Sequence, residues 1–280
     1  MAPSLKVTPV SPIIPLDRLK DGSSFFANFR PASNSSENVG RYQFTPGQTA
    51  ARYPQVAYAT GYYLSSKDID TYSNKLSKFA LADPEYARQL EQVYWFGSIN
   101  STNRSDYDSA SPRFWALGSG TGTVAGTWLN ISISVLPAST PLIHQARFFK
   151  LLASSFWDAG TAWTFHGVRP ADPTWTPLLA TPAHPEYPSG HQCSTGAAVY
   201  VLEAYLGTNF TFSATSSGAP DLGARTYPSF RAAGVEAGDS RLYAGVHFNK
   251  SNVDGSELGY NIAKHIHTKH FKGITFADAL

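Results

Sequence analysis

The sequence has little of what several large classes of protein require. Only 15% of its 280 residues are charged and the formal net charge is +2, which excludes the strongly basic surface of a nucleic-acid-binding protein. No apolar run reaches the length of about 18 residues that a membrane-spanning helix needs. The first residues, Met1 to Lys6, lack the apolar segment of a signal peptide. We therefore expect a soluble protein with no nucleic-acid partner and no membrane span.

Cysteine is almost absent too, because Cys193 is the only one. One cysteine excludes an intrachain disulfide and a cysteine-based zinc site. We expect a small buried side chain at Cys193, and a reactive thiol is the alternative. Asn-x-Ser/Thr sequons indicate a secreted or surface glycoprotein, although a chain rich in Ser and Thr also produces some by chance. The six sequons begin at Asn34, Asn100, Asn103, Asn130, Asn209 and Asn249.

Apolar residues are plentiful, at 42% hydrophobic and 14% aromatic, which is enough for a large core. Helical spacing of these residues predicts three strong helices, over residues 141–162, 190–206 and 229–244. Weaker patterns predict helices within 66–94 and over 256–271, a loop over 97–127 and an extended segment over 131–136. We therefore expect a mainly α fold, a helical bundle with long loops. Residues 1–41 are predicted to form an extended N-terminal arm, and residues 42–280 a single helical domain.

One short motif lies at the start of the helix predicted over 190–206. Pro188 and Gly190 flank Ser189, and His191 follows directly. The first amides of a helix lack intrahelical partners and lie at the positive end of the helix dipole, so they suit an oxyanion. Ser189 adds a hydroxyl, and His191 adds a side chain that can carry a proton near neutral pH. The motif predicts an oxyanion site, and a Ser-Gly helix start beside an incidental His is the alternative.

Two further stretches carry residues suited to the same ligand. Arg169 and Pro170 lie upstream, and Ser240 and Arg241 lie downstream, with His247 six residues after Arg241. Arg suits phosphate-like oxyanions because its guanidinium donates two parallel hydrogen bonds and stays charged. In this order, Arg-Pro, Pro-Ser-Gly-His and Ser-Arg-x5-His resemble the signature of the type 2 phosphatidic acid phosphatase/vanadium haloperoxidase superfamily. The surrounding sequence is most similar to the soluble haloperoxidase branch, and the resemblance covers about residues 42–264.

The resemblance implies a vanadate cofactor, or phosphate as substrate, held by these motifs. His247 would be the vanadium ligand of a haloperoxidase or the phosphoryl-accepting nucleophile of a phosphatase. His191 would be the acid–base group. The implied cofactor-binding residues are Arg169, Ser189, Gly190, Arg241, His247 and His184.

His184 is included for its place seven residues before His191. In the similar haloperoxidases this position lines the halide side of the pocket, and a His there is typical of bromoperoxidases. A histidine can hydrogen-bond to a halide or to the oxidised cofactor, which an apolar side chain cannot. An ordinary loop histidine between two prolines is the alternative.

The chain departs from the signature at two positions. The Lys that lies seven residues before the motif Arg is replaced by Ala162, with Lys150 and Lys250 as candidate stand-ins. A lost cation about 4 Å from an anion removes roughly 4 kcal/mol of Coulomb attraction at an effective dielectric constant of about 20, before desolvation is counted. The Asp of His-x3-Asp is replaced by Ser251, with Asp254 nearby. Loss of a carboxylate that orients a ligating His typically costs about 10–100-fold in affinity.

Asp158 lies on the helix predicted over 141–162, among apolar neighbours. A buried Asp is costly unless it is paired. It is either a hydrogen-bond partner of a catalytic His or a solvent-facing residue near the helix end.

These observations predict a vanadium-dependent haloperoxidase-like enzyme that oxidises halide, bromide preferentially, with hydrogen peroxide. Its partners would be small molecules, namely peroxide, halide and an organic acceptor, and a homo-oligomer is a further expectation. A soluble acid phosphatase using the same pocket is the first alternative. A non-catalytic anion-binding protein is the second, because both departures weaken the implied site.

Overall fold

The computed structural model describes residues 42–271 with one long gap at 163–173 and short gaps at 43, 46, 50, 53–55, 57–58, 78, 81 and 119. The described residues form eight α-helices, one 3-10 helix and a two-stranded sheet. The mainly α prediction is therefore confirmed. The predicted arm over 1–41 lies outside the described residues.

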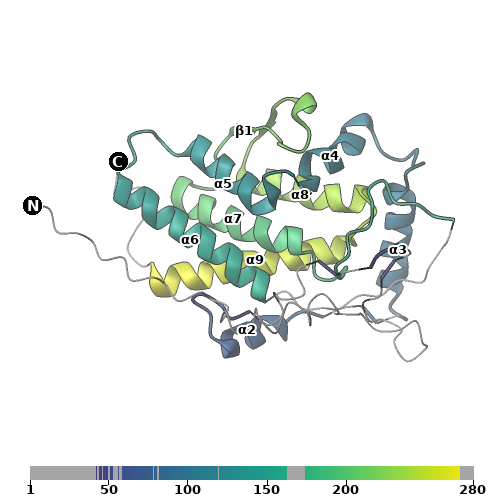
Figure 1. Ribbon diagram of the computed structural model, residues 1–280, viewed down its shortest axis with the longest axis horizontal. Coiled ribbons are helices and arrows are strands. Elements are labelled where there is room, and N and C mark those ends of the chain that lie inside the picture. Colours follow the sequence, from purple (N-terminus) through teal and green to yellow (C-terminus); the bar gives the residue numbers. More distant parts are fainter. Residues whose placement is uncertain are drawn as a thin grey trace, which may run out of the picture.

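The helices are α2 (Ser66–Ser73), α3 (Pro84–Gly97), α4 (Asp106–Ala116), α5 (Thr123–Val135), α6 (Leu142–Thr161), α7 (Gly190–Leu206), α8 (Phe230–Tyr243) and α9 (Asn249–His270). Strands β1 (Phe212–Ala214) and β2 (Arg225–Tyr227) pair antiparallel, with Phe212 opposite Tyr227, and the 3-10 helix η3 (Pro220–Leu222) lies between them. Figure 1 shows α6, α7 and α9 running along the long axis of the molecule, with α4 and α5 on one side and α2 on the other.

Helix α7 is the centre of the bundle. It contacts α5, α6, α8 and α9, and most of its residues are buried. A Cβ atom on Gly259 of α9 would overlap the main-chain carbonyl of Cys193 in α7, and a Cβ on Gly196 of α7 would overlap that of Ser256 in α9. Only glycine permits this approach of two helix backbones. The crossing holds the first turn of α7 against the first half of α9.

The segment predicted as a loop over 97–127 is largely helical, so that expectation is wrong. Ser105 and Asp108 form a reciprocal capping box that starts α4. The aromatic core then extends into α5, because the rings of Trp115 and Trp128 stack with centroids 5.8 Å apart and both side chains are fully buried. Ile131 lies one helical turn after Trp128, so the extended segment expected over 131–136 lies mostly within α5.

The helix predicted over 256–271 begins seven residues earlier, at Asn249. This difference matters because the first turn of α9 then follows directly after His247 and Phe248. Ser251 becomes a buried residue of that first turn.

The carboxylate of Asp158 has a different use from either expected one. It is fully buried and accepts hydrogen bonds from the main-chain N–H groups of Tyr62, Tyr63 and Leu64, the last two at 2.9 Å. Three donors satisfy a buried carboxylate. Asp158 therefore fastens the segment before α2 to α6.

Candidate active site

Ser189 is the N-cap of α7, as the motif predicts. Its hydroxyl accepts from the Gln192 amide at 3.4 Å, and its own amide donates to the Ser251 carbonyl at 2.9 Å. The side chain is fully buried. Gly190 is the first residue of α7, so its amide belongs to the set without intrahelical partners. The tie to Ser251 fixes this helix start against α9.

His191 lies in the first turn of α7. Its Nε2 atom is shielded from solvent and has no hydrogen-bond partner within the part of the chain that the structure describes. Burial lowers the pKa of His191 well below its ordinary value, and the nearby charges of Arg241, His247 and His184 lower it further. The imidazole is therefore neutral at neutral pH and able to accept a proton when an anion offsets these charges.

Arg241 lies in the last turn of α8, where its side chain is 5% exposed. Its Nε atom has no partner among the described residues. Burial lowers the pKa of Arg241 to about 10, so it remains a cation at neutral pH. A buried guanidinium whose Nε–H has no partner is costly, and an oxyanion could accept from that group and compensate the charge.

A glycine turn carries the chain from Arg241 to His247. The amides of Val246 and His247 both return to the Arg241 carbonyl, at 3.1 and 3.3 Å. Gly245, directly before Val246, has φ +76°, and a Cβ atom on it would lie 2.6 Å from the carbonyl oxygen of Gly97 in α3. Any other residue would be strained in both respects. The turn therefore sets His247 at a fixed place relative to Arg241.

His247 is 1% exposed and its ring orientation is specified by a main-chain group. Nδ1 lies 2.6 Å from the Glu186 carbonyl oxygen, which can only accept, so Nδ1 carries the proton. Nε2 is consequently the basic nitrogen of the neutral ring. It is buried and has no partner in the described ranges.

His184 stacks on His247, with ring centroids 5.7 Å apart and an angle of 18° between the planes. Its Nδ1 donates to the Pro185 carbonyl at 2.9 Å. Burial lowers the pKa of His184 to about 3, with the charges of His247, Arg241 and Arg52 contributing. In this neutral form Nδ1 carries the proton and Nε2 carries the lone pair.

Six of the predicted site residues thus lie around the start of α7 and the turn between α8 and α9. Arg169 lies outside the described residues, as does the rest of 163–173. Ala162, at the signature's Lys position, is fully buried in the hydrophobic core. Lys250 donates to Asp254 at 2.7 Å, and Lys150 lies over the ring of Tyr63. Both candidate stand-ins for the Lys therefore have contacts elsewhere.

Two residues near the site were not singled out by the motifs. Arg52 donates its main-chain amide to the Ala183 carbonyl at 2.7 Å, and its charge acts on His184. Glu186 lies beside Nδ1 of His247. No sequence signal marks Arg52, because the residues near it in space, Ala183 and His184, are about 130 positions away in the sequence. Glu186 stands inside the stretch before Pro188, where its charge is the only cue.

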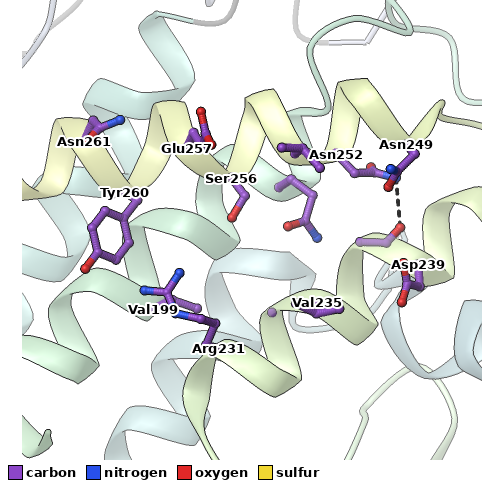
Figure 2. Close-up of a pocket in the computed structure, with 14 residues that line it drawn as sticks. Val199, Arg231, Val235, Asp239, Asn249, Asn252, Ser256, Glu257, Tyr260 and Asn261 are labelled. Atoms are coloured by element: carbon purple, nitrogen blue, oxygen red, sulfur yellow. Dashed lines mark hydrogen bonds between the residues drawn. The ribbon is translucent and has the colours of Figure 1, made fainter. Parts of the chain in front are cut away.

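A second cavity of about 560 Å³ lies on another side of α7. Figure 2 shows its walls, with Arg231, Val235 and Asp239 from α8 facing Asn252, Ser256 and Tyr260 from α9. Gln192, the neighbour of His191 in sequence, lines this cavity, whereas none of the five predicted cofactor-binding residues that the structure describes does. His191 is absent from the lining of this cavity, so the two consecutive side chains of α7 point to different surroundings.

Comparison with known proteins identifies the fold. Residues 158–274 match the family model of the VCPO second helical-bundle domain, whereas no curated protein sequence matches the chain. A bacterial vanadium-dependent iodoperoxidase shares the fold with a TM-score of 0.69 and 22% identity, over 90% of this chain and 65% of its own. An apo-type bacterial vanadium-dependent chloroperoxidase does so with a TM-score of 0.61 and 14% identity, over 89% of this chain and 66% of its own.

The chain therefore spans just under two thirds of the length of these solved proteins. None of the described helices is both long and apolar enough to cross a membrane. The matched residues 158–274 contain all three motifs, from Arg169 to His247, and they include α7, α8 and α9. Residues 158–274 thus match one helical-bundle domain of the VCPO family, and the chain shares the fold of bacterial vanadium-dependent haloperoxidases.

Proposed function

We propose that the chain binds vanadate at the start of α7 and oxidises halide with hydrogen peroxide. The observation that carries this proposal is Nε2 of His247, a buried basic nitrogen with no partner among the described residues. Its lone pair fits a vanadium atom, because Nδ1 carries the proton and donates to a main-chain carbonyl. Arg241 supplies a fixed positive charge for the oxygens of the anion.

Bound vanadate would act as a Lewis acid that activates peroxide without a change in metal redox state. The chain's own contribution is to hold and orient the reactants. His247 would hold the vanadium atom, and Arg169, Arg241, Ser189 and the Gly190 amide would bind the oxygens. His191, neutral before the anion binds, would accept and return a proton at Nε2.

We propose that bromide is preferred over chloride, with His184 on the halide side of the pocket. The stacking of His184 on His247 places it next to the proposed vanadium ligand. Its Nε2 would accept a hydrogen bond from the protonated oxidised product. We also propose that the chain binds vanadate less tightly than relatives that carry the signature Lys.

Acid phosphatase activity is the second candidate, because Nε2 of His247 is equally suited to attack phosphorus. One set of assays separates the candidates. The purified chain is loaded with orthovanadate and supplied with peroxide, a phenol-type dye and bromide, chloride or iodide in turn. Halogenation of the dye supports the peroxidase, and vanadate-inhibited hydrolysis of p-nitrophenyl phosphate supports the phosphatase. Neither activity from a folded chain would leave a non-catalytic anion-binding protein.

His247→Gln should abolish whichever activity is found. The matched control is His267→Gln, since His267 lies on the same helix and bonds to Tyr200 rather than facing the site. Equal loss in both variants would contradict the assignment of His247.

A further inference from the structure

His247 has lost the partner that the signature gives it. The superfamily pattern places an Asp at position 251, where this chain has Ser251, and the alternatives nearest in sequence are committed elsewhere. Asp254 accepts from Tyr187 at 2.6 Å and from Lys250 at 2.7 Å. The side-chain amide of Asn252 donates to the Gly238 carbonyl at 2.9 Å.

A carboxylate from another segment lies at this place. The Oε1 atom of Glu186 is 3.6 Å from Nδ1 of His247, while the main-chain carbonyl of Glu186 accepts from that nitrogen at 2.6 Å. Both contacts come from one residue, although Glu186 and His247 are 61 positions apart in the sequence. The side chain of Glu186 is 24% exposed, so its charge is only partly screened by solvent.

The carboxylate is fixed to the first turn of α9. Oε1 of Glu186 accepts from the main-chain amide of Phe248, the N-cap of α9, at 2.8 Å. It also accepts from the hydroxyl of Ser251, the residue that replaces the signature Asp. A negative charge at a helix N-terminus is electrostatically favourable. Ser251 therefore leaves room for a carboxylate from outside the helix and hydrogen-bonds to it.

We propose that Glu186 is a positioning residue that takes the role of the missing Asp. Its main-chain carbonyl fixes the tautomer of His247, and its carboxylate ties that carbonyl to the first turn of α9, which holds the orientation of the ring. The inference deepens the proposed function, because it concerns the residue that would hold vanadium or accept phosphoryl.

The first test exchanges the carboxylate between the two positions. Glu186→Ala should lower affinity for orthovanadate and for inorganic phosphate by about 10–100-fold, as loss of a carboxylate behind a ligating His does elsewhere. Adding Ser251→Asp to Glu186→Ala should recover most of that loss. Adding Ser251→Ala instead should recover none. Glu257→Ala, which removes an exposed carboxylate of α9, should leave affinity unchanged.

The second test needs no anion, so it stands even if the chain is neither peroxidase nor phosphatase. Nitrogen-15 NMR of the imidazole groups should show His247 as a single Nδ1–H tautomer in the native chain. Glu186→Ala should average the two nitrogen shifts of His247, and the Ser251→Asp double variant should separate them again. Glu186→Gln keeps an acceptor for Phe248 and Ser251, so it serves if the Ala variant does not fold, with a smaller loss of affinity expected.

Unchanged His247 shifts in folded Glu186→Ala would overturn the proposal, and so would an unchanged anion affinity of Glu186→Gln where the Ala variant does not fold. A folded Glu186→Ala, Ser251→Asp chain that recovers neither the shifts nor the affinity would overturn it as well. Restored shifts without any anion binding would instead support the positioning role and contradict the proposed function.

Discussion

The two positions at which the chain departs from its superfamily signature have different surroundings. At Ser251 the lost carboxylate is replaced in space, because Glu186 lies beside Nδ1 of His247 and receives the Ser251 hydroxyl. At Ala162 neither candidate lysine replaces the lost cation, because Lys150 and Lys250 have contacts elsewhere. The Ala162 side chain lies in the hydrophobic core, and its carbonyl accepts from the Ser73 hydroxyl at 3.2 Å.

The difference shows which kind of lost side chain another segment of the chain can replace. A carboxylate that orients an imidazole acts over one contact, so any segment that reaches that contact can supply it. A cation that binds the anion must reach the anion itself. The side chain at position 162, at the end of α6, instead points into apolar surroundings. We infer that the missing positive charge cannot be restored at position 162.

Ala162→Lys should produce the largest effect on folding. An ammonium group placed in the core without a partner should lower the free energy of unfolding by about 3 kcal/mol or more, with no gain in anion affinity. Urea unfolding at pH 7 measures the first quantity and calorimetry with sulfate the second. Ile143→Lys, at an exposed position of the same helix, should change stability by no more than about 0.5 kcal/mol.

A stable Ala162→Lys chain that bound sulfate more tightly would remove the contrast between the two positions. It would show that position 162 corresponds to the signature Lys and that a side chain there can reach the site.

Binding of an anion should be accompanied by uptake of a proton by His191 or His184. In the anion-free chain the pKa values of His191 and His184 are both lowered, so both rings are neutral at pH 7. A bound sulfate offsets the charge of Arg241 and raises these pKa values, so the complex binds more protons than the free chain. Affinity should therefore rise as the pH is lowered from 7 to 5, by up to about tenfold per pH unit for one proton taken up.

Calorimetry in two buffers of different ionisation enthalpy counts the protons directly, and sulfate itself does not titrate in this range. His267→Gln should keep the same pH dependence, whereas His191→Gln should reduce it. A sulfate affinity that stays flat between pH 7 and pH 5 would mean that neither ring responds to the anion.

Arg52→Ala should have the smallest effect. Arg52 is exposed, and its charge acts on His184, so it is a candidate for part of the missing cation. Because solvent and salt screen such a charge, we expect a loss of sulfate affinity of only about two- to threefold at low salt. This loss should disappear at about 0.5 M salt. Lys150→Ala, whose cation lies over Tyr63, is the matched control and should have no effect.

Much of the fold and most of the described site could be predicted from local patterns. The apolar spacing of α6, α7 and α8 and the N-cap at Ser189 are properties of consecutive residues, so they are visible in the sequence. Helices α4 and α5 were missed because their Gly, Ser and Asn content resembles a loop, while Trp115 and Trp128 stabilise them through contacts with each other. The partners of His247 and Asp158 come from distant segments, and no spacing rule indicates such pairs.

The glycine contact between α7 and α9 has a consequence for hydrogen exchange. Ser189 donates its amide to Ser251, and a Cβ on Gly255 would lie 2.5 Å from the Ser189 carbonyl, so the helix start cannot swing away unless α9 moves with it. Exchange of the Ser189 amide then requires an opening of the bundle rather than local fraying. The start of α7, where we propose that the anion binds, should therefore open only when the core itself opens.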